Sequence, residues 1–461
     1  MGGGGRGDGA IPAPRPAECV AVDFAGDGAG VAEMSWGMWE IWHAMVGQSS
    51  SFPLGGPAPV AAGTSLEDVA AQVRYLMARF PSMRTRLRFD ATGRPTQELF
   101  ATGTVTLEIY DAGDDDDPGD IAAAVEREYR RTEFDYADEW PVRMGVIRQH
   151  GRPVSMVAIT SHLVTDALGG MIMLRDVAAQ ETAPVAGMQQ FEQAQWQGSP
   201  EGQRQNDRAL RHWETILRAV PLRQLPGPTD PRSPRHWDAE FCSPALTAAL
   251  RVIAARTGAE LPAVRLALFA VALHRITGIS PVAVRPVVSN RFRPALADVV
   301  CMVAQAGVCL LDVKDATVDQ AVEQARRGAL SAYKHAYFHP ERMRELVARV
   351  SRERGADVTV GCFFNDLTAR VSPEDSPVPT AEEWAAALRT AGSDAAFRWT
   401  GRQDIPVERL FVTVDDVPGC SRFEFRVDTH FISPADTEAL ARAMEGAAVE
   451  AALLAPAVPA G

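Results

Sequence analysis

A histidine and an aspartate stand four positions apart, as His162 and Asp166, in the segment from Thr160 to Gly170. A neutral imidazole can take a proton from an attacking amine or hydroxyl near pH 7, so His162 could act as a general base. The aspartate could orient that imidazole or hold the loop through an arginine. The same spacing suits a loop histidine followed by a helix-capping aspartate, and in a chain with nine histidines the spacing alone favours this structural role.

Other residues that could carry chemistry form weaker patterns. His335 and His339 have the spacing of two metal ligands on one helix, but no third ligand is near in the sequence, so we expect a helix surface and no metal site. Gly169 and Gly170 precede a predicted helix but lack the pattern of a phosphate-binding loop. The six cysteines are scattered without paired spacing and are predicted to be free thiols.

The His162 segment is predicted to lie on a loop between a strand and a helix. Residues 142–147 and 154–160 have the pattern and spacing of a hairpin, and residues 171–178 are predicted to be helical. Sites often lie on such loops. Further predicted helices are 64–80 (capped by Ser65 with Asp68), 121–131, 189–197, 207–217, 247–257, 263–276 and 435–454, and further strands are 84–89, 282–288, 307–313, 358–364, 410–414 and 423–432.

Length and composition restrict the class of protein. The chain has 461 residues, 46% hydrophobic and 23% charged, which is typical of a soluble globular protein. The net charge of −13 argues against a generic nucleic-acid binder. The longest apolar run, 266–273, is too short to cross a bilayer, and residues 1–16 lack the apolar core of a signal peptide. We therefore expect a cytoplasmic protein.

Both halves of the chain mix helical and strand patterns, which predicts two α/β lobes. The predicted organisation, in chain order, is a disordered tail at 1–17, an N-terminal lobe at 18–179, a connector at 180–235, a C-terminal lobe at 236–455 and a tail at 456–461.

The order of these features resembles the condensation-domain superfamily of nonribosomal peptide synthesis. The family's motif HHxxxDG stands here as SHLVTDA at residues 161–167. The other matches, spread over residues 19–455, are SWGMW at 35–39, MRTRL at 83–87 (family LRTRF), Phe134-Asp135-Tyr136 to Pro141-Val142-Arg143 (family FDLxxxPLLR), Gln190-Phe191 with Trp196 and His212-Trp213, PVVSNR at 286–291 (family GxPxxNR) and FFN at 363–365.

This resemblance implies an α/β (α+β) architecture with the chloramphenicol-acetyltransferase-like fold, in which two lobes form a V-shaped pseudo-dimer around a central substrate tunnel. It implies that His162 is the general base or positions the nucleophile, and that Asp166 is a structural residue paired with an arginine. Arg291 is the first candidate for that arginine and Arg143 the second. Asn365 could bond to the tetrahedral intermediate or the acceptor, and a strand-end asparagine bonded to backbone is an equal alternative.

The chain departs from the family pattern at the motif itself. Ser161 replaces the first histidine, which in the family mostly supports the loop, and its hydroxyl can still donate and accept hydrogen bonds. Ala167 replaces the glycine, whose absence of a side chain permits close backbone approach and a positive φ, so its methyl could narrow the tunnel or shift the loop. Gly169 and Gly170 could compensate. The floor of the site is altered at 301–305, CMVAQ.

The predicted function is a free-standing condensation-type acyltransferase in specialised-metabolite biosynthesis. It would transfer an acyl or aminoacyl group from a carrier-protein thioester to an amine. No tightly bound cofactor is expected, and the donor would be a phosphopantetheine-linked or coenzyme A thioester. The expected partners are a carrier protein and a small amine or alcohol, with no nucleic acid and no membrane, and the fold is compatible with a monomer. The alternatives are a non-catalytic docking platform for carrier proteins or tailoring enzymes and a coenzyme-A-dependent O-acyltransferase.

Overall fold

The computed structural model describes residues 14–368, 383, 384, 386, 388 and 395–454. Within that part, the chain folds into two compact units. Unit 1 contains residues 14–46, 50–198 and 291–303, and unit 2 contains residues 47–49, 199–290 and the described residues from 304 onward. Both mix helices with sheets, so the predicted α/β class is confirmed. The predicted connector at 180–235 does not stay together, because its residues up to Gly198 belong to unit 1 and the rest belong to unit 2. Residues 1–13 and 456–461 of the predicted tails lie outside the described residues.

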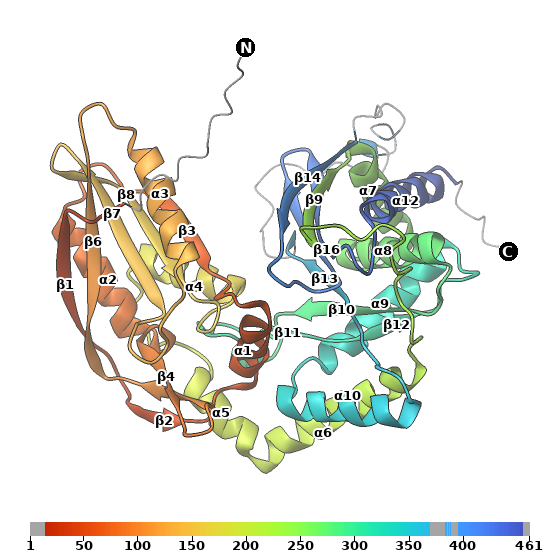
Figure 1. Ribbon diagram of the computed structural model, residues 1–461, viewed down its shortest axis with the longest axis horizontal. Coiled ribbons are helices and arrows are strands. Elements are labelled where there is room, and N and C mark those ends of the chain that lie inside the picture. Colours follow the sequence, from red (N-terminus) through yellow and green to blue (C-terminus); the bar gives the residue numbers. More distant parts are fainter. Residues whose placement is uncertain (1–13, 369–382, 385, 387, 389–394, 455–461) are drawn as a thin grey trace. The chain divides into compact units, whose positions relative to one another are not determined.

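Unit 1 contains a five-stranded sheet in the order β1-β6-β7-β8-β3 and a three-stranded sheet in the order β2-β5-β4 (Figure 1). Its elements, in chain order, are β1 (Glu18–Ala25), β2 (Gly30–Ala32), α1 (Trp36–Gln48), β3 (Leu54–Pro59), α2 (Leu66–Arg79), a short 3-10 turn (Pro81–Arg84), β4 (Thr85–Phe89), β5 (Pro95–Leu99), β6 (Thr102–Ala112), α3 (Pro118–Arg131), β7 (Val142–Gln149), β8 (Arg152–Thr160), α4 (Ala167–Ala179), α5 (Gln190–Gly198) and a second 3-10 turn (Pro294–Leu296).

Local sequence signals set the first elements of unit 1. Ser65 and Asp68 form the predicted capping box at the start of α2, each bonding to the backbone N–H of the other. The predicted hairpin is β7 and β8, an antiparallel pair in which Val142 lies opposite Thr160. Helix α3 packs its apolar stripe against β7 and β8, where Val125 and Ile159 are fully buried. The hairpin therefore gives the His162 loop a rigid base.

Unit 2 contains one larger sheet, in the order β11-β10-β13-β15-β16-β9-β14, with β12 also paired to β10. Its elements are α6 (Pro200–Ala219), β9 (His236–Cys242), α7 (Pro244–Thr257), α8 (Leu261–Thr277), β10 (Val282–Val288), β11 (Gln305–Ala306), β12 (Cys309–Leu311), α9 (Val318–Lys334), α10 (Pro340–Arg354), β13 (Cys362–Asp366), β14 (Ala396–Gln403), β15 (Leu410–Val417), β16 (Cys420–Asp428) and α12 (Pro434–Leu453).

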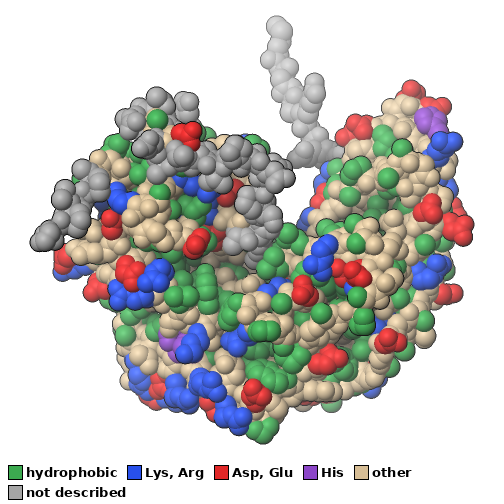
Figure 2. Space-filling model, turned by 180° about the vertical axis from the view of Figure 1, so that it is seen from behind, with side chains coloured by type: hydrophobic (Ala, Val, Ile, Leu, Met, Phe, Trp, Pro, Cys, Tyr) green, Lys and Arg blue, Asp and Glu red, His purple; other side chains and the backbone are tan. Residues whose placement is uncertain are grey.

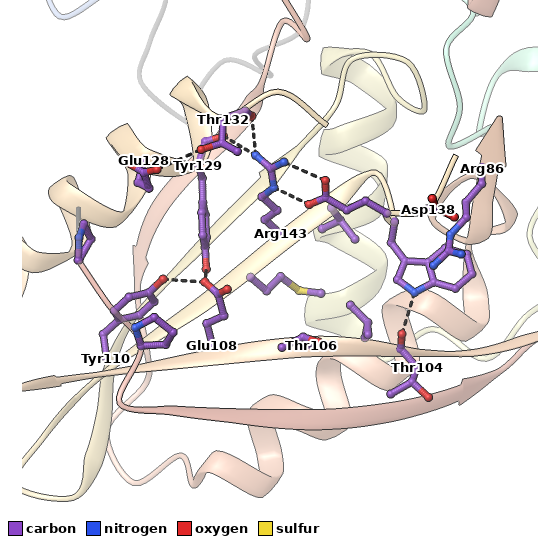
Figure 3. A pocket seen from close by; sticks show the side chains of 17 residues that line it. Arg86, Thr104, Thr106, Glu108, Tyr110, Glu128, Tyr129, Thr132, Asp138 and Arg143 are labelled. Carbon is purple, nitrogen blue, oxygen red and sulfur yellow. Dashed lines mark hydrogen bonds and ion pairs between the residues drawn. The ribbon is translucent and has the colours of Figure 1, made fainter. Parts of the chain in front are cut away.

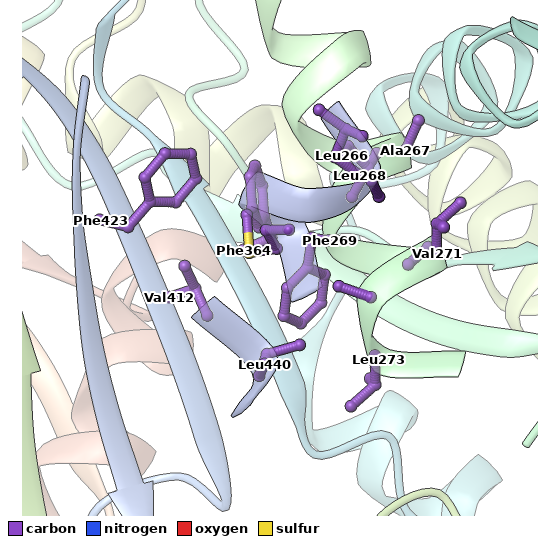
Figure 4. Packing of buried hydrophobic residues seen from close by; sticks show 14 of the residues in the cluster. Leu266, Ala267, Leu268, Phe269, Val271, Leu273, Phe364, Val412, Phe423 and Leu440 are labelled. Carbon is purple, nitrogen blue, oxygen red and sulfur yellow. The ribbon is translucent and has the colours of Figure 1, made fainter. Parts of the chain in front are cut away.

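The core of unit 2 lies between this sheet and the helices that cover it. Helix α8 is apolar nearly all round and packs against α9 and α12. Figure 4 shows Phe269 of α8 beside Phe364 of β13, with ring centroids 5.4 Å apart, and Leu440 of α12 close to them. A helix apolar on all sides is buried, so the run at 266–273 is explained as the centre of a core.

Two predictions about this unit are wrong. Cys242 and Cys420 form a disulfide, because β9 and β16 are adjacent strands whose ends place the two Cα atoms 6.1 Å apart. The remaining cysteines are free, as predicted. His335 and His339 do not share a helix: His335 ends α9 and His339 precedes Pro340, which starts α10 because proline suits the first turn of a new helix.

The surface carries charges of both signs. Figure 2 shows acidic and basic side chains interspersed over the face in view. Many charged side chains of the described residues form ion pairs, such as Arg88 with Glu98 at 2.5 Å. Among the helices of the described part, none is both long and apolar enough to cross a bilayer.

Candidate functional site

His162 lies on the loop between β8 and α4, as predicted, and its backbone is fixed on both sides. The N–H of Ser161 donates to the carbonyl of Pro141 at 2.9 Å, and the N–H of His162 donates to the carbonyl of Ser51 at 3.3 Å. The N–H of Leu163 donates to Ser161 Oγ at 3.2 Å. The half-buried imidazole therefore stands on a backbone held at three successive residues.

Asp166 is buried, and its carboxylate accepts hydrogen bonds from three directions. Oδ1 accepts from the N–H of Gly169 at 2.9 Å, so Asp166 is the N-cap of α4. Oδ2 accepts from Arg291 Nη1 at 2.7 Å and from the N–H of Val303 at 3.3 Å. The structural role that the spacing alone favours is therefore realised, and the same carboxylate makes the ion pair that the resemblance implies.

Arg291 is the arginine of that pair. Its side chain is 7% exposed and that of Asp166 is 5% exposed, so the charges meet away from water. Arg291 Nη2 also donates to the carbonyls of Val299 and Cys301, at 3.0 and 3.4 Å. The pair thus ties the histidine loop to residues 291–303, which belong to the same unit although they follow it by more than a hundred positions.

Gly169 has no room for a side chain. A Cβ at this position would lie 2.6 Å from Thr165 Oγ1, 3.1 Å from Arg291 Nη2 and 3.5 Å from Asp166 Oδ1. At Gly170, by contrast, a Cβ would meet nothing within 4 Å. Ala167 is the exposed first residue of α4 and does not have a positive φ, so the left-handed conformation expected of a glycine there is not used.

Of the other two predicted site residues, Arg143 has a different acidic partner and Asn365 belongs to unit 2. Arg143 forms a bidentate ion pair with Glu139, with N–O distances of 2.6 and 2.9 Å. It also donates to three backbone carbonyls at the end of α3 and just after it. It therefore does not pair with Asp166. Asn365 is on β13 of unit 2, opposite Thr413 of β15, and its Oδ1 is buried without a hydrogen-bond partner among the described residues.

The altered floor segment packs beneath the ion pair. Cys301 is fully buried and its Sγ accepts a hydrogen bond from Gln193 Nε2 at 3.0 Å. Burial raises the pKa of the Cys301 thiol to about 12, so the thiol stays protonated and is not a nucleophile at neutral pH. Gly37 of α1 approaches the Met302 backbone so closely that a Cβ would lie 2.1 Å from its carbonyl oxygen.

Tyr136 is a further residue of this group, and it is not among the site residues predicted from the sequence. Its hydroxyl lies 2.8 Å from Ser161 Oγ. A signal was present, because Tyr136 stands where the family pattern has leucine and Ser161 stands where it has histidine. The two changes together could have indicated a contact.

A cavity of about 590 Å³ lies elsewhere in unit 1, over β6 and β7 (Figure 3). Glu108 Oε2 accepts hydrogen bonds from Tyr110 and Tyr129 at 2.6 and 2.5 Å on one side of it. Burial raises the pKa of both phenols, which keeps them protonated. His162 and Asp166 do not line this cavity. Among the described residues, no group of three or more His, Cys, Asp or Glu could hold a metal ion.

The chain matches the model of a known protein family over most of its length. The family model "Condensation domain" matches residues 41–381. Surfactin synthase subunit 2 of Bacillus subtilis is 24% identical over 312 residues, which are 66% of this chain and 8% of that protein. The chain thus matches less than a tenth of the length of this curated relative.

Solved structures with the same fold cover nearly the whole chain. The condensation domain that mediates chain release from the enacyloxin polyketide synthase has a TM-score of 0.71 and 18% identity, over 95% of this chain and 85% of that one. The X-domain from teicoplanin biosynthesis has a TM-score of 0.69 and 16% identity, over 93% and 96%. The predicted chloramphenicol-acetyltransferase-like fold is confirmed by these likenesses.

Proposed function

The chain belongs to the condensation-domain family, and from this premise we propose that it transfers an acyl or aminoacyl group from a carrier-protein thioester to an amine. The amine nitrogen attacks the thioester carbonyl, the C–N bond forms and the C–S bond breaks. His162 accepts the proton that the nitrogen loses and returns it to the departing thiolate. A positioned base of this kind contributes about 10²–10⁴-fold to the rate.

The main support for this proposal is the buried ion pair between Asp166 and Arg291, which holds the histidine loop. Removing two charges from water is costly, and the pair compensates only when its geometry is good and the remaining lone pairs are satisfied. Here the carboxylate also accepts two backbone N–H groups, and Arg291 Nη2 donates to two backbone carbonyls. A buried ion pair of this kind supports the proposal because it would fix the loop, and with it the position of His162.

The donor proposed for this site is a phosphopantetheine-tethered thioester, and no resident cofactor is required. Condensation domains act on substrates of this kind. The thioester carries its own leaving group, so the protein has to supply only a base and a fixed geometry. A coenzyme A thioester offers the same carbonyl chemistry, and an alcohol acceptor would give an ester in place of an amide.

A docking role is the second candidate, because two motif positions differ from the family pattern. Ser161 and Ala167 replace the histidine and glycine, and the X-domain from teicoplanin biosynthesis shares the fold. One of the solved structures with this fold is a complex of that X-domain with OxyB. In this role the chain would bind carrier proteins or tailoring enzymes without forming a bond.

A mass-spectrometric transfer assay distinguishes the two. Carrier proteins and coenzyme A loaded with a panel of acyl groups are mixed with a panel of amines and alcohols, and wild type is compared with His162→Ala. Product that is lost in the variant supports acyl transfer with His162 as base. Product formed equally by both proteins refutes the role of His162. Carrier binding without product from any pair refutes the enzymatic proposal in favour of docking.

A further inference from the structure

The side chain at position 161 connects the histidine loop to a neighbouring segment. Ser161 is fully buried, and its Oγ lies 2.8 Å from the hydroxyl of Tyr136. The same Oγ accepts the N–H of Leu163 at 3.2 Å. A hydroxyl can donate one hydrogen bond and accept two, so Ser161 can make both contacts at once. The result is a chain of hydrogen bonds from Tyr136 to the residue that follows His162.

Tyr136 is itself held in place, so its hydroxyl is a fixed point. Its carbonyl accepts the N–H of Leu87 at 2.7 Å, which anchors the backbone to β4. Its ring packs edge-on against Trp42, with centroids 5.8 Å apart, and stacks on Phe134 at 5.9 Å. An aromatic side chain has two rotatable bonds, and contacts on both sides leave little freedom to either.

The phenol of Tyr136 is also uncharged at neutral pH. Burial raises the pKa of Tyr136 to about 12, an effect that the hydrogen bond with Ser161 only partly opposes. The hydroxyl therefore remains protonated and uncharged near pH 7, where it can serve as a hydrogen-bond partner. Its contribution is to position the loop.

We propose that Tyr136, acting through Ser161, is a positioning residue for His162. This inference rests on the proposed function, because it assigns the pair a role in the same reaction. Serine is smaller than the histidine of the family motif, and tyrosine is longer and more polar than the leucine of the FDL pattern. The tyrosine hydroxyl fills the space and supplies the hydrogen bond, so the two departures from the motif compensate each other.

The test compares Tyr136→Phe, Ser161→Ala and the double variant in the transfer assay. Tyr136→Phe should lower kcat about five- to tenfold with little change in KM, which is the rate equivalent of one hydrogen bond. Ser161→Ala also removes the acceptor of the Leu163 N–H, so it should lower kcat at least as much. The double variant should be no slower than the slower single variant, because Ser161→Ala already removes the connection that Tyr136→Phe breaks. Tyr75→Phe is the matched control, since its hydroxyl bonds to the carbonyl of Glu181 at 2.7 Å, and it should keep the wild-type rate.

A swap experiment separates positioning from general loss of structure. Ser161→His alone should lower activity and Tm, because the Tyr136 hydroxyl occupies the space that the imidazole needs. Adding Tyr136→Leu should restore both. If Tyr136→Phe is as fast as wild type, if the losses of the two single variants multiply, or if Ser161→His is tolerated without the second change, the inference is overturned.

A spectroscopic readout keeps this inference distinct from the proposed function. The ring signals of His162 in an NMR spectrum of histidine-labelled protein are identified by their loss in His162→Gln. They should shift in Tyr136→Phe and stay unchanged in Tyr75→Phe, whether or not any donor and acceptor give product. Unchanged signals in Tyr136→Phe would refute positioning, whereas shifted signals without product from wild type would refute only the proposed function.

Discussion

Adding one methyl group at Gly169 should disturb the site, whereas the same addition at Gly170 should not. The new Cβ would lie 2.6 Å from Thr165 Oγ1 and 3.1 Å from Arg291 Nη2 in the first case and would meet nothing within 4 Å in the second. Both positions are in α4, where alanine is favoured over glycine by up to about 1 kcal/mol. The comparison therefore isolates the effect of the crowding.

The cost at Gly169 follows from the surrounding side chains. Thr165 is buried and β-branched, so its side chain has little freedom to turn away. Arg291 could yield only by lengthening the hydrogen bonds that Nη2 donates to Val299 and Cys301, or with them the ion pair that Nη1 makes with Asp166. Overpacking of this kind costs about 1–3 kcal/mol, which cancels or exceeds the gain in helix propensity. Gly169→Ala should thus be about 1–3 kcal/mol less stable than Gly170→Ala.

Thermal unfolding and the transfer assay together measure this prediction. The difference corresponds to a Tm lower by roughly 2–4 °C per kcal/mol in Gly169→Ala than in Gly170→Ala. The first variant should also have a lower kcat, because the loop shifts when the ion pair lengthens, while the second should match wild type. Equal Tm values and equal rates for the two variants would refute the argument that the pair of Asp166 and Arg291 is closely packed.

Three further predictions concern buried charges and cysteines. Arg291→Met leaves a buried carboxylate without its cation and should cost about 3–5 kcal/mol in the free energy of unfolding, measured by urea denaturation. Burial raises the pKa of Asp176, but hydrogen bonds from Arg79 and Arg175 outweigh this effect and hold the pKa below its usual value. The stability that this carboxylate contributes is therefore present above about pH 3.9 and is lost as the pH falls through the lowered pKa. Arg79→Met should unfold at a higher pH than wild type in an acid titration followed by circular dichroism. Alkylation of the denatured chain without reductant should label four cysteines, and six after reduction, whereas six in both would exclude the disulfide.

Local signals made part of the fold predictable. The capping box of α2 depends on residues three positions apart, and the hairpin of β7 and β8 on a short turn. The alternating pattern and the turn are in the sequence itself, so the loop that carries His162 could be located. Helix α1 and strand β1 were not predicted, because burial on their packed faces is set by partners far along the chain.

Long-range pairing limited the prediction of the site. Arg291 was selected over Arg143 through the family resemblance, since no local pattern relates it to Asp166 across 125 positions. The N–H of Val303 could not be predicted at all, because a backbone donor has no signature in the sequence. The disulfide joins cysteines 178 positions apart and needed the pairing of two strands to appear.

The central claim is that His162 acts as the base on a loop held by Asp166 and Arg291. The most direct test compares the single-turnover rate of amide formation in wild type and in His162→Ala. The rate is monitored by the mass of the carrier protein as it loses its acyl group, and the two proteins are first shown to have the same Tm. We expect a rate at least about 10²-fold lower in the variant, with unchanged binding of the carrier protein. A variant that transfers the acyl group at the wild-type rate would contradict it.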